Sequence, residues 1–197
     1  MKKLCLFLSL LIPLSAHTAP ISEMPPRLQT FSENLGTVTA TFTQTKILPE
    51  ITRRFISTGR VKFIKGTGFT WQQTTPTTKT FTATTDQYCT EDGIAHPLNE
   101  LPHFNYVKQT IDDMLSGDMN KFLFTFSVDY TDTPDSDLWH LTATPRFSTI
   151  SDILQDITMY GSTTDLTKII ITYQNGTILI MEFAKTSQDP INDEIKC

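Results

Sequence analysis

The stretch "GFTWQQTTPTTKTFTATT", residues 68–85, decides the fold. Its large apolar side chains, Phe69, Trp71 and Phe81, lie two residues apart or in matching phase, and most residues between them are threonine or glutamine. This alternation is typical of strands that have one face in water. Disordered polar tracts lack phased aromatic residues. The stretch therefore predicts strands whose aromatic face meets either a packed core or a cavity.

The same alternation continues on both sides of this stretch. It appears in "TVTATFTQT" (37–45), "STGRVKFIK" (57–65), "KTFTATTDQY" (79–88), "KFLFTFSVDY" (121–130) and "LWHLTA" (138–143). In the fourth segment Phe122, Phe124, Phe126, Val128 and Tyr130 are predicted to share one face. The last segment, "LTKIIITYQNGTILIMEF" (166–183), predicts a hairpin that turns at Asn175-Gly176. Shorter turns are predicted at residues 65–68 and at Thr75-Pro76.

Two helices are predicted by apolar spacing. One covers residues 27–35, where Leu28, Phe31 and Leu35 form a stripe, and the other lies in residues 105–118. Two short helices cannot cover roughly eight to ten strands that each have an apolar face. The antiparallel sheet must therefore either close into a filled barrel or curl around a cavity that the helices partly plug. We expect one mainly β domain with a minor helical part.

The N-terminal residues predict export. The basic "MKK", the apolar run "LCLFLSLLIPL" and the small residues of "SAHTAP" form a secretory signal peptide, taken as residues 1–19, with a soluble domain over residues 20–197. The formal charge of −5 becomes −7 without Lys2 and Lys3, since 14 basic residues then face 21 acidic ones. This acidic balance argues against nucleic acid as a partner.

The cysteines allow two interpretations. In an oxidising compartment Cys89 and Cys197 can form a disulfide, but Cys197 at the chain end can equally remain a free thiol. Cys89 and His96 could in principle form a thiol–imidazole pair, which makes a secreted cysteine-dependent enzyme an alternative. The sequence shows no HExxH, CxxC or GxSxG motif. We expect no catalytic activity, no cofactor and no metal.

Several segments together resemble one family. The chain reads F-T-Q at residues 42–44, then a short loop, then "STGRVKFIKGTGFTWQQTTP" at residues 57–76. This is similar to the signature of the outer-membrane lipoprotein carrier (LolA) family, which is F-x-Q, G-x-[LVF]-x-[FLW], a basic turn, [FL]-x-W and a proline. "LWHLTATP" (138–145) and the closing hairpin extend the resemblance over residues 28–185. The spacing "LPEITRRFISTG" resembles divergent LolA-like paralogues more than the housekeeping carrier.

The resemblance implies an incomplete, strongly curved antiparallel barrel with helices as a lid over an apolar cavity. In the periplasm such a cavity receives acyl chains of lipoproteins, or of another acylated envelope lipid, between an inner-membrane donor transporter and an outer-membrane acceptor. The family often has an arginine and a proline in the turn before [FL]-x-W, and that arginine bonds the lid closed. Lys65 and Gly66 stand there in this chain, so Lys65 is the expected lid-latch position.

Strand phase then assigns the residues of the expected site, in a protein expected to be a monomer. The predicted cavity lining is Val38, Phe42, Val61, Phe63, Phe69, Trp71, Phe81, Phe124, Phe126 and Trp139. The predicted lid stripe is Val107, Ile111, Met114 and Leu115. Two alternatives stay open: the aromatic residues pack against one another in a filled barrel, or the protein is a static envelope scaffold.

Overall fold

A single antiparallel sheet dominates the structure, a computed structural model that describes residues 23–84, 86–89, 93–100, 113, 119–133 and 135–185. The strand order is β6-β5-β4-β3-β2-β1-β11-β10-β9-β8-β7. The strands are β1 (Thr37–Leu48), β2 (Ile51–Ile64), β3 (Gly68–Thr75), β4 (Lys79–Thr84), β5 (Gln87–Cys89), β6 (Ala95–Pro97), β7 (Phe126–Asp132), β8 (Trp139–Pro145), β9 (Leu154–Gly161), β10 (Leu166–Tyr173) and β11 (Ile178–Lys185). The helices are α1 (Pro26–Asn34), the 3-10 helix η1 (Leu98–Glu100), α3 (Met119–Thr125) and α4 (Ser148–Ser151).

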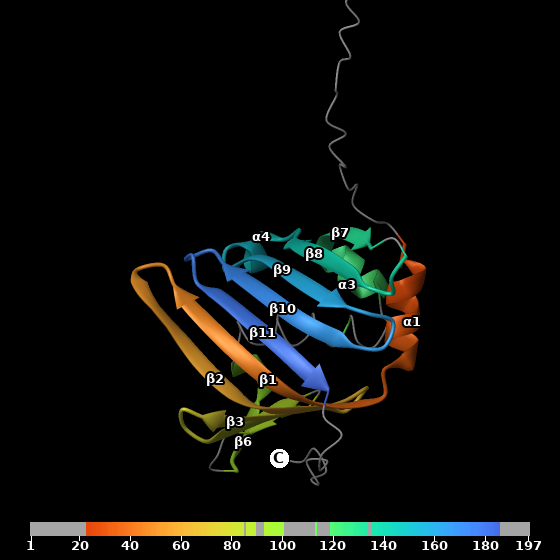
Figure 1. Cartoon of the computed structure of the whole chain (residues 1–197). Coiled ribbons are helices and arrows are strands. Elements are labelled where there is room, and N and C mark those ends of the chain that lie inside the picture. Colours follow the sequence, from red (N-terminus) through yellow and green to blue (C-terminus); the bar gives the residue numbers. More distant parts are fainter. Residues whose placement is uncertain are drawn as a thin grey trace, which may run out of the picture.

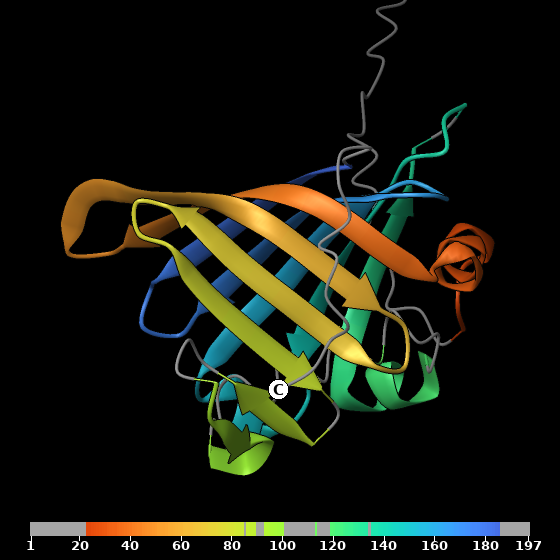
Figure 2. The same ribbon diagram turned by 90° about the horizontal axis from the view of Figure 1, so that it is seen from below.

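The sheet curves strongly, so that its two halves face each other. Figure 1 shows β1 and β7–β11 side by side, with β2 and β3 turning underneath them. Figure 2, seen from below, shows β2–β4 in yellow and green crossing in front of the blue strands. The edge strands β6 and β7 stand at opposite ends of the strand order. The predicted strongly curved, open antiparallel sheet is therefore confirmed.

Cross-strand pairing divides the side chains between two faces, because directly opposed residues of an antiparallel pair lie on the same face. Phe42 is opposite Gly59 and Phe183, and Val61 is opposite Trp71. We call the face that carries these residues the inner face. Threonines of the outer face bond across strands, as in Thr70–Thr82 at 3.3 Å and Thr142–Thr158 at 3.2 Å. The sequence alternation therefore separates a hydroxyl-rich outer face from an apolar inner one.

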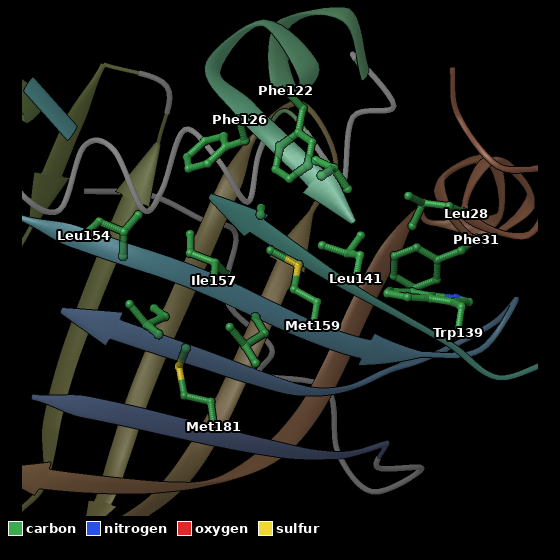
Figure 3. Close-up of a cluster of buried hydrophobic side chains, with 14 of the residues drawn as sticks. Leu28, Phe31, Phe122, Phe126, Trp139, Leu141, Leu154, Ile157, Met159 and Met181 are labelled. Atoms are coloured by element: carbon green, nitrogen blue, oxygen red, sulfur yellow. The ribbon is translucent and has the colours of Figure 1, made fainter. Parts of the chain in front are cut away.

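The tightly packed core belongs to the half formed by β7–β11. Leu141, Ile157 and Met159 have no exposed surface, and Figure 3 shows them projecting inward from their strands. At one end of the sheet, helix α1 closes this core. Its Phe31 ring meets the Trp139 ring edge-on at 5.2 Å, and the Trp139 indole Nε1 donates a hydrogen bond to the Ser162 carbonyl at 2.7 Å. The predicted stripe of Leu28, Phe31 and Leu35 is buried as expected.

The predicted single strand over residues 121–130 is wrong. Residues up to Thr125 belong to helix α3, and β7 starts only at Phe126. Successive helical residues are 100° apart, so residues two apart point in nearly opposite directions. Phe122 is accordingly buried, whereas Phe124 is 70% exposed. Phe124 is thus not on the inner face where the sequence placed it.

Two further boundaries differ from the prediction. Residues 79–88 form two strands rather than one, because the chain turns between Thr84 and Gln87, where the Thr84 hydroxyl accepts a bond from the Gln87 amide at 3.4 Å. The expected short loop after F-T-Q is strand almost throughout, since β1 reaches Leu48 and β2 begins at Ile51. The hairpin turn at Asn175-Gly176 is confirmed, with Gly176 at φ 79°.

Candidate ligand-binding face

A row of aromatic side chains crosses the inner face of β1–β5 and reaches β6. The Phe42 and Trp71 rings stack with centroids 3.5 Å apart. Further along, Phe69 and Phe81 lie 6.1 Å apart, and Phe81 and Tyr88 lie 5.7 Å apart. The row ends where the Tyr88 ring stacks on the His96 ring at 5.1 Å. We call these six residues the aromatic row.

The aromatic row is less covered than the core opposite it. Phe69, Trp71, Phe81 and Tyr88 are only half-buried, whereas the core tryptophan, Trp139, is 2% exposed. Phe69 and Trp71 also pack against the edge of the core cluster. The inner face thus has a fully packed half and a half in which these four rings keep some accessible surface, although Phe42 and Phe63 are buried there too. Apolar surface of this kind is typical of sites for apolar ligands.

Gly59 makes room for the Phe42–Trp71 stack. A Cβ atom at position 59 would lie 2.0 Å from the Gln72 carbonyl oxygen and 2.8 Å from the Phe42 ring. Both distances are far below van der Waals contact. The missing side chain therefore lets the Phe42 ring lie over β2. Gly59 is the glycine of the G-x-[LVF]-x-[FLW] signature, but the sequence did not indicate its packing role.

One polar group lies buried beside this stack. Ser57 is on the inner face opposite Gln44, and its hydroxyl is the one buried side-chain polar atom in the described part of the chain without a hydrogen-bond partner. An unpartnered buried hydroxyl costs about 1–3 kcal/mol. It is therefore a group that an ester or amide carbonyl of a ligand could satisfy.

The predicted lining residues fall into three groups. Those of the first half share the inner face: Val38, Phe42, Val61, Phe63, Phe69, Trp71 and Phe81. Phe126 and Trp139 also face inward but are almost completely covered by the core. Phe124 lies outside, on α3. The prediction missed Tyr88 and His96. In one continuous strand Tyr88 would have the opposite phase to Phe81, and only the turn between β4 and β5 brings the two rings to the same face.

The predicted lid lies outside the described residues, as Val107, Ile111, Met114 and Leu115 are not among them. The expected latch residue is described. The Lys65 amine donates a hydrogen bond to the Ser32 carbonyl at 2.9 Å, and the Lys65 amide donates to the Gly36 carbonyl at 3.1 Å. Ser32 belongs to the last turn of α1, where a cation is also favoured by the helix dipole. Lys65 therefore fastens α1 to the turn between β2 and β3.

A second group of bonds holds the other side of α1. The Arg27 guanidinium donates to the Thr133 and Leu138 carbonyls at 3.1 and 3.3 Å and lies 3.9 Å from the Asp132 carboxylate. The Tyr130 hydroxyl donates to the same carboxylate. Burial, with the bond and charge of Asp132, raises the pKa of Tyr130 well above its usual range. Helix α1 is thus tied to both halves of the sheet at this end, which we call the α1 end.

Replacing Lys65 by methionine should loosen this attachment. The Ser32 carbonyl would lose its charged donor, so we expect the free energy of unfolding to fall by about 1–2 kcal/mol. Lys65→Arg should retain most of the stability, because arginine can donate to the same carbonyl. Lys79→Met, at an exposed position on β4, is the matched control and should shift stability by less than about 0.5 kcal/mol. Urea unfolding of the variants measures the difference. If Lys65→Met and Lys79→Met lowered the free energy of unfolding equally, Lys65 would not be a latch.

The alternative of a cysteine-dependent enzyme is contradicted at Cys89. This cysteine is disulfide-bonded and 5% exposed, so it offers no thiolate. Pairing also places Cys89 opposite Ala95 while His96 is opposite Tyr88, so the sulfur and the imidazole point to opposite faces of the sheet. Cys197, the expected disulfide partner, lies outside the described residues.

The described residues contain no group of three or more histidine, cysteine, aspartate or glutamate side chains placed to hold a metal ion. Among the helices that the structure describes, none has the length and apolar character needed to cross a membrane.

Comparison with known proteins gives structural similarity without close sequence relatives. No protein-family model matches the chain, and no curated protein matches it. A LolA superfamily protein from Nitrosomonas europaea is similar in structure, at 10% identity over 83% of this chain and 93% of its own, with a TM-score of 0.42. MucB has 13% identity over 87% of this chain and 61% of its own, with a TM-score of 0.48. A DUF1329 family protein from Desulfovibrio piger has 6% identity over 83% and 93%, with a TM-score of 0.40. These similarities concern the fold, at low sequence identity.

Proposed function

We propose that this protein is a periplasmic carrier that binds the acyl chains of lipoproteins, or of another acylated envelope lipid, and shuttles them toward the outer membrane. The observation that carries the proposal is the set of half-buried rings in the aromatic row, Phe69, Trp71, Phe81 and Tyr88, opposite a fully packed core. A lipid chain of about 16 carbons in water costs on the order of 12 kcal/mol. A carrier that covers such a chain removes most of this barrier to crossing an aqueous compartment.

The geometry suggests how a chain would be held. The partly exposed rings of Trp71, Phe81 and Tyr88 offer apolar surface along one direction across the strands, and the buried Phe42 ring supports Trp71 from below. Close-packed interiors resist deformation, so the core half would act as a rigid wall. The Ser57 hydroxyl beside the stack could bond a carbonyl at the head of the acyl chain. These features favour a ligand with one long apolar part and one carbonyl group.

The proposal includes the partners and the lid that the sequence resemblance implies. An inner-membrane transporter would deliver the cargo, and an outer-membrane acceptor would receive it. Lys65 would then control how firmly α1 closes one end of the inner face, through its bond to Ser32. The predicted lid stripe, Val107 to Leu115, would compete with cargo for the aromatic row.

Titration of the mature protein, residues 20–197, with a fluorescent fatty-acylated peptide tests the proposal. We expect saturable binding and a rise in melting temperature. The double variant Trp71→Ser/Phe81→Ser should bind at least about tenfold more weakly, because two aromatic contacts are worth roughly 1.4 kcal/mol or more. Tyr160→Ser removes an exposed ring from the outer face and should leave the affinity unchanged.

The result that would contradict the proposal is the absence of saturable binding together with an unchanged melting temperature. A static envelope scaffold would give that result and would still bind a protein partner. Equal loss of affinity in the Tyr160→Ser control would place binding on the outer face instead.

A further inference from the structure

The β2 strand of the β1–β2 hairpin extends well beyond its neighbour β3. The last residue of β1 that pairs with β11 is Ile47, and the first residue of β2 that pairs with β3 is Thr58. Within the described sheet, residues 51–57 of β2 therefore have no paired β3 residue opposite them. Figures 1 and 2 show the hairpin, in orange, projecting past its neighbours at the end opposite α1. We call residues 46–56 the hairpin tip.

The hairpin tip carries exposed apolar side chains on both of its faces. Ile51, Phe55 and Ile56 are 44%, 45% and 59% exposed. Phe55 and Ile56 are adjacent in a strand, so they point to opposite faces. A flat protein surface could cover only one of these faces. The apolar boundary of a lipid bilayer can surround both, and this difference favours a membrane as the occupant.

Charge complements the apolar tip. Lys46, Arg53 and Arg54 are exposed beside these residues, in a chain with a formal charge of −5. Near the tip end, the basic residues at and around the strand ends are Lys46, Arg53, Arg54, Lys79 and Arg146. The acidic residues there are Glu50, Asp152 and Asp156. At the α1 end they are Glu33, Asp132, Asp135, Asp137 and Asp165, with Arg27 and Lys65. An anionic surface would attract the first end and repel the second.

We propose that the hairpin tip docks the protein on an anionic lipid membrane. Ile51, Phe55 and Ile56 would enter the boundary between headgroups and acyl chains, and the basic side chains would bind lipid phosphates. Each basic residue near such a surface contributes about 1 kcal/mol. The backbone groups of residues 51–57 that point away from β1 would stay at the hydrated headgroup level, because unpaired strand edges are excluded from hydrocarbon. The α1 end would then face away from the membrane.

This docking site uses other residues than the aromatic row, so its test is separate as well. The probe is a flotation assay with vesicles of phosphatidylcholine alone or with phosphatidylglycerol added. The mature protein should float with the anionic vesicles and much less with the neutral ones. Higher salt should weaken this binding, because it screens the basic residues.

Variants then locate the contact. Phe55→Ser/Ile56→Ser should lose at least about tenfold in vesicle binding, given roughly 1.5–3 kcal/mol for burying one such side chain. Arg53→Gln/Arg54→Gln should reduce both the binding and its salt dependence. Leu138→Ser is the matched control, since Leu138 is 49% exposed but lies at the α1 end, and it should bind as the wild type does. All these positions are exposed, so melting temperatures should change little.

The outcomes separate this proposal from the carrier function. Trp71→Ser/Phe81→Ser should still float normally even if it no longer takes up acyl probes. The proposal is overturned if the wild type does not bind anionic vesicles, which would leave the tip to a protein partner. It is also overturned if the Leu138→Ser control loses as much binding as the tip variant, or if the tip variant loses none.

Discussion

Replacing Trp139 by alanine is expected to lower the free energy of unfolding by about 3–5 kcal/mol. The Trp139 ring is 2% exposed, lies edge-on against Phe31 and donates a hydrogen bond to the Ser162 carbonyl. Alanine would leave a cavity under α1 and an unpaired carbonyl. This loss also weakens the attachment of α1, since Phe31 contacts the ring directly. Urea unfolding followed by circular dichroism measures the change.

The informative comparison is Trp71→Ala. Trp71 is less buried than Trp139, so its loss should cost clearly less. The same variant should weaken acyl binding, whereas the stability loss should dominate in Trp139→Ala. Equal stability losses at the two positions would mean that the aromatic row is ordinary core. That result would favour the filled barrel over the carrier.

Replacing Gly59 by alanine should have the second large effect. The new Cβ atom would fall 2.0 Å from the Gln72 carbonyl oxygen and 2.8 Å from the Phe42 ring. Main chain or ring must therefore move, and overpacking of this kind costs about 1–3 kcal/mol. Because the Phe42 ring stacks on Trp71, the tryptophan emission should shift and acyl affinity should fall. Urea unfolding and fluorescence titration measure both effects.

Gly36→Ala is the control for this substitution. A Cβ atom at position 36 meets no atom within 4 Å, so the change should be close to neutral. If Gly59→Ala were equally neutral, the close approach of β2, β3 and the Phe42 ring would not exist in the folded protein.

Much of the fold could be predicted because two-residue alternation reports directly on sheet faces. Phe42, Trp71 and Phe81 were assigned to one face from phase alone, and the pairing confirms that they share it. The hairpin at Asn175-Gly176 could also be predicted, since an Asn-Gly pair adopts the backbone conformation that a tight turn requires. Strand alternation and the Asn-Gly turn each depend only on residues that are neighbours in the sequence, so both could be predicted.

The errors arose where the two-residue period of a strand and the helical period of about 3.6 residues fit the same stretch. In residues 121–130 the aromatic residues alternate, but Phe122 and Phe126 are also four apart, as on one face of a helix. The structure forms a helix up to Thr125, and Phe124 is left outside. The short loop predicted after F-T-Q is also wrong, since most of these residues are strand. Neither stretch can be assigned from local pattern alone.

Coverage of the inner face could not be predicted because it depends on contacts that are distant in sequence. Trp71 and Trp139 have similar strand patterns, yet only Trp139 is fully covered. The difference comes from α1. Lys65, just after β2, bonds to this helix, and Arg27 of the helix itself donates to the turn between β7 and β8. A sequence pattern shows which face of a strand is apolar, but it does not show which other element covers that face.

Quenching of tryptophan fluorescence by a brominated fatty acyl probe tests the central claim most directly. The chain has two tryptophans, Trp71 on the aromatic row and Trp139 in the core. Bromine quenches only at short range, so a chain bound along the row should quench Trp71 far more than Trp139. The account predicts saturable quenching in the wild type and little quenching in Trp71→Phe, which keeps an aromatic ring at that position. It would be contradicted by the absence of saturable quenching in the wild type, or by equal quenching in Trp71→Phe.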